Sequence, residues 1–364
     1  MKKLNDPVRK VNAYCAGLDV HKGITVYTLF DPKGAVAETG DFRSTRADFE
    51  DFIKRVLKNG ETHFTFEASR SSLWVHGLIR EFVDDEYVHV AQSKRIKAIA
   101  NSNSKNDDND SWWLGYLTYE GRLPEAHVPE HEILELRIAT RERAAAVQHR
   151  TKIICRLKAH FAQVGLIVPG SSIRTKQAQL FMAEQALQIK GVRGRALRSC
   201  LDELNYQDFA IQEWNDVIGE VSALIPAVET IEGHIPGIGS VLAATIVAEA
   251  GDLKRFHSQK AFGRTTGLTP SDRSSSGKTI HGGITREGNP HLRWALTQAA
   301  IGCLRARKGA GLAVGNWIRA REKRMGNKSK ARAAGGRKLA ESIWRLFHLG
   351  ECFDAAHSFG GVPK

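Results

Sequence analysis

The sequence predicts three parts: an α/β domain at the N-terminus, a helical middle able to form a coiled coil, and a mainly helical C-terminal part. Strand-like and helix-like runs alternate from residue 12 to about residue 120. From 130 to 226 strand patterns nearly vanish, and apolar residues recur three or four positions apart, which is the helical period. Beyond 229 helical patterns return together with many lysines and arginines. The expected domains are 12–125, 126–228 and 229–350, followed by a tail at 351–364.

The first part carries its own element signals. Strands are indicated by β-branched and alternating apolar runs, helices by apolar residues at helical spacing, and a turn by Asp31-Pro32-Lys33-Gly34. Strands that alternate with helices indicate a mixed sheet covered by helices. In chain order we expect a strand pair, a strand, a helix, a strand, a helix and a strand, at 13–30, 35–37, 45–57, 62–66, 73–82 and 87–90.

Two apolar stripes mark the helical middle. A sustained three-to-four alternation is typical of a coiled coil. We expect an arm for oligomerisation, because the second stripe is narrow and flanked by charge; the core of a helical bundle within one chain is the alternative. The stripes are Ile154, Leu157, Phe161 and Val164, then Ile211, Trp214, Ile218, Val221 and Ile225.

Composition bounds the class of partner. The chain has 364 residues, 42% of them hydrophobic and 26% charged, which predicts packed domains rather than disorder. The net charge is +13, and the window 301–345 holds 13 Lys or Arg against two Glu. Such a balance favours a polyanion, most simply nucleic acid. The residues expected to contact phosphates here are Arg321, Arg324, Lys328 and Lys330.

The cysteines and the N-terminus bear on the compartment. Five widely spaced cysteines without a C-x-x-C pair argue against a disulfide framework or a zinc site. The N-terminus has no apolar run after its charges, so we expect no signal peptide. No stretch approaches the roughly 18 apolar residues of a membrane span. A cytoplasmic protein is expected.

Four carboxylates stand on segments that look like separate elements. Asp19 lies in an apolar, β-branched run, and Glu67 closes an alternating run. Asp107 and Asp110 are three positions apart, so on a helix they would share one face. Hard cations such as Mg²⁺ take oxygen ligands, and a catalytic pair of ions lies about 3.5–4 Å apart. The set predicts the metal site of a nuclease or polynucleotidyl transferase, although 106–110 alone is also typical of a polar capping loop.

A turn between two helical patterns reads Ile235-Pro236-Gly237-Ile238-Gly239. Gly237 and Gly239 would let backbone N–H groups approach a phosphate at a helix N-terminus. This pattern is typical of a helix-hairpin-helix, which holds nucleic-acid backbone without reading sequence. An ordinary tight turn between packed helices is the alternative.

A serine cluster, 274–276, lies in a Gly- and Ser-rich stretch from Gly267 to Gly288. Residue chemistry favours a flexible loop, because serine is a poor nucleophile at neutral pH and no activating His/Asp pair adjoins it. The alternative is a loop that presents a hydroxyl, activated by a bound metal, to a phosphodiester. Lys278, Arg286 and Arg293 would then neutralise phosphate oxygens.

Together these motifs resemble the DEDD-type insertion-sequence transposases of the insertion sequence one-hundred-and-ten family, described as bridge-RNA-guided serine recombinases. The resemblance spans nearly the whole chain, with small departures at Asn106 and Ser111, where many members have Thr and Ala. The matching motifs are Gly17-Leu18-Asp19-Val20-His21-Lys22, Phe66-Glu67-Ala68-Ser69, Lys105-x-Asp107-x-x-Asp110, Pro236-Gly237-Ile238-Gly239, Gly267-Leu268-Thr269-Pro270 through Ser-Gly-Lys, and Ile284-Thr285-Arg286-Glu287-Gly288-Asn289-Pro290-His291-Leu292-Arg293.

The resemblance implies a fold and a set of site residues. It implies a ribonuclease-H-like first domain, similar to the RuvC junction resolvase, a coiled-coil linker, and a C-terminal transposase domain with a nucleophilic serine. In the family that serine stands five residues after the Pro of the Gly-Leu-x-Pro motif. This is Ser275 here, with Ser274 and Ser276 one position away. The implied ligands of two Mg²⁺ ions are Asp19, Glu67, Asp107 and Asp110.

We therefore expect a transposase that excises and inserts its own mobile element through a Mg²⁺-dependent covalent phosphoserine link. The resemblance implies donor DNA, target DNA, a structured noncoding bridge RNA and further copies of the chain, in a dimer or tetramer, as partners. Base pairing would then carry sequence choice. A RuvC-like junction endonuclease that uses water is the first alternative. A nonenzymatic nucleic-acid-binding protein is the second.

Overall fold

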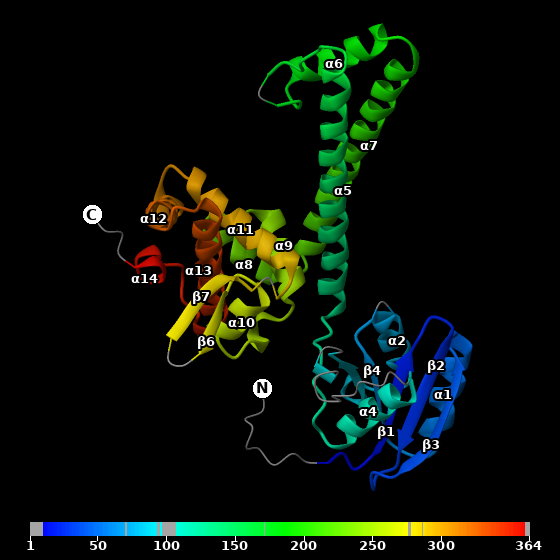
Figure 1. Cartoon of the computed structure of the whole chain (residues 1–364). Coiled ribbons are helices and arrows are strands. Elements are labelled where there is room, and N and C mark those ends of the chain that lie inside the picture. The colour runs from blue at the N-terminus through cyan, green and yellow to red at the C-terminus, as the bar shows by residue number, and fades with distance from the viewer. Residues whose placement is uncertain are drawn as a thin grey trace. The chain divides into compact units, whose positions relative to one another are not determined.

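The structure, a computed structural model, describes residues 10–69, 71–92, 95–96, 107–170, 172–275, 278–285 and 287–360. At 107–109, 271–275 and 278–282 it describes the backbone alone. The chain divides into two compact units between Val128 and Pro129 (Figure 1). A separate division at 228–229 stays a prediction, and a helix spans that position. Within the described residues, no helix is long and apolar enough to cross a bilayer.

The first unit is built on a mixed five-stranded sheet in the order β3-β2-β1-β4-β5. Strands β1, β2 and β3 form an antiparallel meander, and β1, β4 and β5 run parallel. The predicted mixed sheet is therefore confirmed, and the carboxyl ends of β1 and β4 lie next to each other. The strands are β1 (Tyr14–Val20), β2 (Ile24–Phe30), β3 (Val36–Arg43), β4 (Thr62–Glu67) and β5 (Val88–Ala91).

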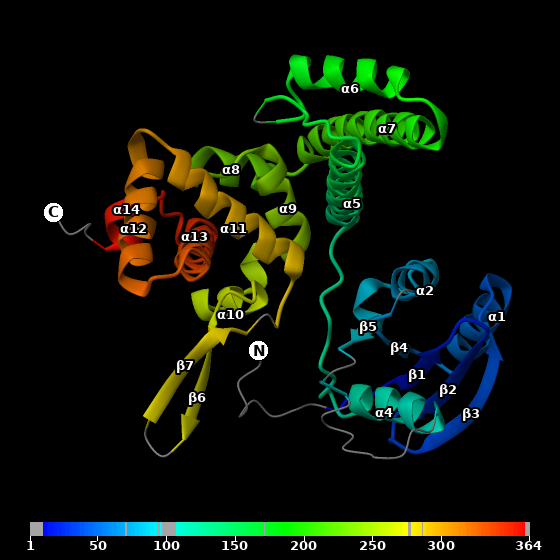
Figure 2. The same ribbon diagram turned by 45° about the horizontal axis from the view of Figure 1, so that its top comes forward.

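Helices cover both faces of this sheet. One face carries α1 (Arg46–Leu57) and α2 (Ser72–Ile79), which pack on buried Leu18 and Phe64. Helix α1 begins where Thr45 accepts a hydrogen bond from the Asp48 N–H, and its apolar spacing turns Phe49, Phe52, Ile53 and Val56 inward. The opposite face carries α4 (Asp107–Tyr119), seen in front of β1 in Figure 2.

The second unit begins with two long helices that lie side by side, α5 (His131–Ala162) and α7 (Gly191–Ser222), with α6 (Lys176–Gln188) at one end (Figure 1). Leu157 and Phe161 of α5 pack with Leu197 and Cys200 of α7, and Ile218 joins the core of the helices that follow. Burial within one chain, the alternative to an oligomerisation arm, thus accounts for much of both stripes.

The rest of the second unit is helical around a small-residue core. Helices α9 and α11 pack closely because alanines face each other, among them Ala243, Ala244, Ala295 and Ala299. The elements are α8 (Pro226–His234), α9 (Ser240–Ala250), a 3₁₀ turn (Leu253–Arg255), α10 (Gln259–Thr265), β6 (Pro270–Ser275), β7 (Lys278–Ile284), α11 (Pro290–Arg305), α12 (Gly309–Met325), α13 (Lys328–Leu349) and α14 (Ala355–Phe359).

The prediction of a flexible loop from Gly267 to Gly288 is wrong for most of that stretch. Strands β6 and β7 pair there as an antiparallel hairpin. The serines and glycines favour a loop. However, the return strand contains β-branched Thr279, Ile280 and Ile284, which favour a paired, extended backbone.

Candidate active site and nucleic-acid interface

Asp19 and Glu67 lie next to each other at the carboxyl ends of two parallel strands. Leu18 of β1 pairs with Phe66 of β4, and each carboxylate is the next residue along its strand. Gly17 and Thr65, which also pair, each lie two residues before the carboxylate of their own strand. Because side chains alternate along a strand, both carboxylates belong to the sheet face of Gly17 and Thr65.

Helix α4 crosses this same face in close contact with β1. A Cβ atom built on Gly17 would stand 2.0 Å from the Ser111 carbonyl oxygen and 2.4 Å from the Gly115 nitrogen. Hydroxyl groups fix the helix on both sides: Thr28 Oγ1 lies 2.9 Å from Ser111 Oγ, and Thr65 Oγ1 lies 2.6 Å from Thr118 Oγ1. Ser111 therefore anchors the helix to β2.

The first turn of α4 lies toward the end of β1 that holds Asp19. The last residue of α4, Tyr119, packs with Cys15 near the beginning of β1, so the helix runs opposite to the strand. Asp110 is partly buried and directly precedes Ser111. Asp107 is the first residue of the helix, so the pair lies on a helical turn rather than in a polar loop. The side chain of Asp107 is outside the described part.

Three of the four predicted ligands thus converge on one end of one sheet face from β1, β4 and α4. Among the side chains that the structure describes, no group of three or more acids, histidines or cysteines is close enough to hold a metal ion. The strands and the helix therefore bring these positions to one end of the sheet, but the described side chains are not close enough together to form a metal site. Their oxygen chemistry suits Mg²⁺, and clustered carboxylates repel one another unless a cation neutralises them.

His21 adjoins this group and was assigned no role from the sequence. Its Nε2 lies 3.0 Å from Asp19 Oδ2. His21 also lines a cavity of about 650 Å³ on the same face, together with Thr28, Asp41 and Trp112. The available signal was its spacing of two residues from Asp19.

The serine hairpin carries the other predicted catalytic residue. Ser275 of β6 pairs with Lys278 of β7, and Ser274 pairs with Thr279. The backbone register therefore makes Lys278 the cross-strand neighbour of Ser275. Their side chains, together with Ser276 and Arg286, lie outside the described residues. Arg293 is partly buried in the first turn of α11, four positions after the cap residue Asn289.

The turn between α8 and α9 gives its two glycines different roles. Gly237 has φ +77°, and a Cβ there would stand 2.4 Å from the Ala299 carbonyl oxygen of α11. The Cys303 thiol also donates to the Pro236 carbonyl, at 3.3 Å. Packing against α11 thus explains Gly237. Gly239 caps α9 with no described atom within 4 Å of its built Cβ.

The basic tract divides into two groups. Arg321, Arg324 and Lys330 line a cavity of about 530 Å³ beside the hairpin. Lys328 is not among the lining residues and forms an ion pair of 3.8 Å with Glu322.

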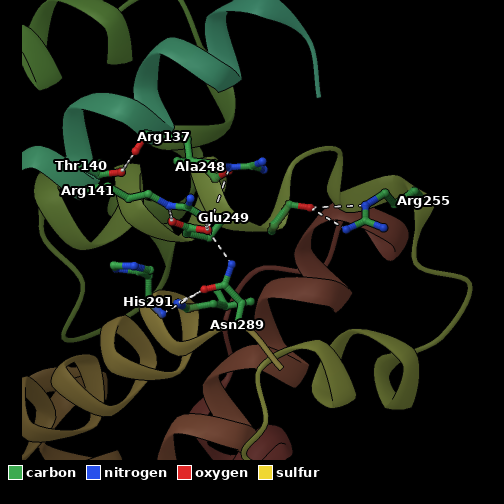
Figure 3. A network of polar contacts seen from close by, with 10 residues as sticks. Arg137, Thr140, Arg141, Ala248, Glu249, Arg255, Asn289 and His291 are labelled. Atoms are coloured by element: carbon green, nitrogen blue, oxygen red, sulfur yellow. Dashed lines mark hydrogen bonds and ion pairs between the residues drawn. The ribbon is translucent and has the colours of Figure 1, made fainter. Parts of the chain in front are cut away.

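Glu249 of α9, a buried carboxylate that the sequence analysis did not identify, joins the long helix α5 to the start of α11 (Figure 3). The Glu249 side chain is fully buried, and Arg141 of α5 donates to both its oxygens at 2.7 and 2.9 Å. Asn289 donates its side-chain amide to Glu249 and caps α11 by accepting from the His291 N–H. Arg137 donates to the neighbouring Ala248 carbonyl at 2.8 Å. We call Arg137, Arg141, Glu249 and Asn289 the Glu249 junction.

Opposing effects act on the Glu249 carboxyl group. Burial alone would raise its pKa, but hydrogen bonds from Arg141 and Asn289 and the charges of Arg141 and Arg137 outweigh burial. The pKa of Glu249 is therefore lowered, and the group is held as a carboxylate. The sequence signal was a lone charged residue within the apolar helix 240–250.

Comparison with known proteins identifies the family. Residues 16–165 match a DEDD transposase model of the IS110 family, and residues 233–313 match the model "Transposase IS116/IS110/IS902 family". The chain is 26% identical to the transposase for insertion sequence element IS1111A of Coxiella burnetii, over 71% of both chains. It is also 26% identical to the putative transposase y4qE of Sinorhizobium fredii, over 78% of this chain and 70% of the relative.

These matches cover the carboxylate-bearing unit and the region from α8 to α12 separately, and both point to one family. The alternative of a nonenzymatic nucleic-acid-binding protein is therefore not retained. The DEDD type of the first model also implies dependence on a divalent metal. The chain is a transposase of the IS110 family, an enzyme of DNA cleavage and strand transfer.

Proposed function

We propose that this transposase cleaves and joins DNA where β1, β4 and the first turn of α4 meet, with Asp19, Glu67, Asp107 and Asp110 as the ligands of two Mg²⁺ ions. The observation that carries the proposal is the parallel register, in which Asp19 and Glu67 follow adjacent paired residues on the face crossed by α4. An antiparallel meander extended by parallel strands, in the order β3-β2-β1-β4-β5, supports a ribonuclease-H-like domain similar to RuvC.

The residues of this face have distinct roles in the proposal. Bound Mg²⁺ would supply Lewis-acid stabilisation of charge on the attacking and leaving oxygens. Asp19 is oriented by its contact with His21, and Asp110 is held in place by Ser111, whose hydroxyl bonds to Thr28. The strands and the helix that carry the carboxylates would thus be held in place, and the side chains would turn toward the ions when these bind.

The nucleophile in this proposal is Ser275. Its Oγ would attack phosphorus while the bond from phosphorus to a sugar oxygen breaks, and the serine proton would pass through solvent to that leaving oxygen. A phosphoserine link results, and attack by a sugar hydroxyl reverses it to join strands. Support comes from Lys278, which is the cross-strand neighbour of Ser275 and could neutralise phosphate charge.

Several partners belong to the same proposal. Donor and target DNA would pair with a structured bridge RNA, and basic surfaces around Arg286, Arg293, Lys328 and the cavity beside the hairpin would hold backbone. Backbone N–H groups after Gly239 could contact a phosphate at the start of α9. Since the two proposed centres lie on different units, we propose a dimer or tetramer in which subunits combine them.

A denaturing gel of the protein with labelled element DNA and Mg²⁺ tests these points. The wild-type chain should give a protein-linked strand, and Asp19→Asn should abolish all cleavage. Asp51→Asn, an exposed carboxylate of α1, is the matched control. Ser275→Ala should remove the linked strand, with Ser274→Ala and Ser276→Ala as neighbours. Full cleavage by all three serine variants would favour water as the nucleophile.

A further inference from the structure

We propose that the cavity at the root of the hairpin, between β6–β7 and helices α12–α13, binds one nucleotide of the DNA strand. We call it the root cavity; its volume is about 530 Å³. The binding inference rests on residues of this cavity alone, whereas the location of that nucleotide relative to the cut also rests on the proposed function of Ser275.

The root cavity combines cations with an apolar surface. Its apolar lining comes from distant parts of the chain and includes buried Leu268 and partly buried Ile284, Trp317, Ala333 and Ala334. Met325 also lines the cavity and is 41% exposed. The positively charged lining residues are Arg321, Arg324, Lys330, Arg337 and Lys338.

The charge of this lining is not balanced locally. Of the described residues that line the root cavity, none is a carboxylate. Glu341, one turn further along α13, contacts only Arg337, at 3.2 Å, and Lys338, at 3.8 Å, among these cations. Several cations beside an apolar surface are costly unless an anion accompanies them. The site therefore favours an anionic ligand.

The surroundings of Arg321 show this excess of positive charge most clearly. Its guanidinium carbon lies 4.8 Å from the centre of the Trp317 ring, and its Nε is buried without a hydrogen-bond partner among the described residues. Burial lowers the pKa of Arg321, and the nearby charges of Arg324 and Arg337 lower it further. A phosphate in the cavity would lie against the part of Arg321 that lines it and would offset the repulsion among the three arginines.

The volume and the apolar wall of the root cavity favour a nucleotide over a bare phosphate, and a neighbouring cavity serves as a comparison. The volume falls in the range of small-ligand pockets, about 300–1,000 Å³. A phosphate alone needs no apolar wall, whereas a nucleobase stacks on apolar groups and on arginine planes. The neighbouring cavity, about 670 Å³, includes Lys260 and Arg264 but also Glu287 and Glu341. Its mixed charges make it a poorer anion site.

The fold sets the distance of this nucleotide from the serine. Pro270 and Ile284 pair at the root of the hairpin, and Ser275 lies five residues further along β6. A strand rises about 3.3 Å per residue, and a DNA strand advances about 3.4 Å per nucleotide. The bound nucleotide should therefore lie about five nucleotides from the phosphate presented to Ser275.

Calorimetric titration of the full chain with dAMP, deoxyribose 5-phosphate and inorganic phosphate tests the site without any cleavage chemistry. We expect dAMP to bind about tenfold more tightly than deoxyribose 5-phosphate, from base stacking. Arg321→Met and Ala334→Phe, which fills the cavity without changing charge, should each weaken dAMP binding at least fivefold. Lys323→Met removes a cation of α12 outside the lining and should change it less than twofold.

Two results would overturn the nucleotide site. One is equal binding of dAMP and inorganic phosphate. The other is equal weakening by Arg321→Met and Lys323→Met, which would indicate a general basic surface. Circular dichroism checks whether Ala334→Phe folds. If it does not, the comparison of Arg321→Met with Lys323→Met still tests the site. None of these readouts involves Ser275 or Mg²⁺, so they are independent of the proposed cleavage.

Photocrosslinking in the complete complex distinguishes DNA from RNA as the source of the nucleotide. Bromodeoxyuridine about five nucleotides from the cut should crosslink to the peptide containing Met325, and two nucleotides from the cut it should not. Crosslinking from bromouridine in the RNA alone would assign the cavity to RNA and contradict the proposal.

Discussion

The Glu249 junction and the root cavity place arginines beside apolar surface in opposite ways. In the junction, Arg141 meets both oxygens of a fully buried carboxylate, and Asn289 completes the bonding. In the root cavity, Arg321 has an unpartnered Nε among the described residues, and no carboxylate is among the described lining residues. The first arrangement holds helices together. The second leaves its charge for a ligand.

The difference teaches where charge serves folding and where it serves binding. Breaking a buried ion pair strands a charge and is strongly destabilising. Removing a cation that has no partner strands nothing. Variants of the two regions should therefore change stability very differently, although each removes one charge.

The largest expected effect is in the junction. Glu249→Gln removes charge-assisted hydrogen bonds at a fully buried carboxylate, while the half-exposed Arg141 keeps part of its hydration, so we expect the free energy of unfolding to fall by about 2–3 kcal/mol. Guanidinium chloride unfolding followed by circular dichroism measures this loss. Glu232→Gln, an exposed residue of α8, is the matched control. A loss below about 1 kcal/mol for Glu249→Gln would show that the junction contributes little to the fold.

The contribution of Glu249 to the stability of the fold should depend on pH. Because the pKa of Glu249 is lowered in the folded chain, the unfolded chain binds a proton at this residue more readily. The stability that Glu249 contributes is therefore complete above its ordinary pKa, near 4.5, and is lost as the pH falls through the lowered value. Unfolding curves between pH 6 and pH 3, compared with Glu249→Gln, isolate this contribution. Parallel pH profiles for the two proteins would contradict it.

The smallest expected effect on stability is in the root cavity. Arg321→Met loses a contact with Trp317 worth about 0.5–1 kcal/mol but relieves repulsion from Arg324 and Arg337. We expect the free energy of unfolding to change by less than about 1 kcal/mol, while dAMP binding weakens. A loss as large as that of Glu249→Gln would mean that Arg321 serves the fold, and the comparison would fail.

Much of the first unit could be predicted because its signals are local. Apolar spacing predicted α1 and alternation predicted β4, whereas the parallel register that puts Asp19 beside Glu67 is known only from the structure. Asp107 and Asp110 followed from the spacing of three on one helix. Their approach to Asp19 depends on the contact between α4 and Gly17, which no local pattern contains.

The second unit was harder to predict because its main contacts join distant residues. Glu249 and Arg141 are 108 positions apart, so only the isolated charge in an apolar helix gave a sign of the junction. The hairpin is a local pairing between β6 and β7, but serine-rich composition concealed it. The basic tract was visible as charge, but Leu268 and Ile284, which turn part of it into a cavity, come from elsewhere in the chain.

Gly17, which has no side chain, determines how closely Asp110 of α4 can approach Asp19 of β1. Position 17 must stay bare for α4 to rest on β1, since even a methyl group there would collide with the backbone at Ser111 and Gly115. Enlarging that position would lift the helix and carry Asp110 away from Asp19 while every acid stayed in the sequence. A copy of the element could thus be inactivated by a change that an inventory of its charged residues would overlook.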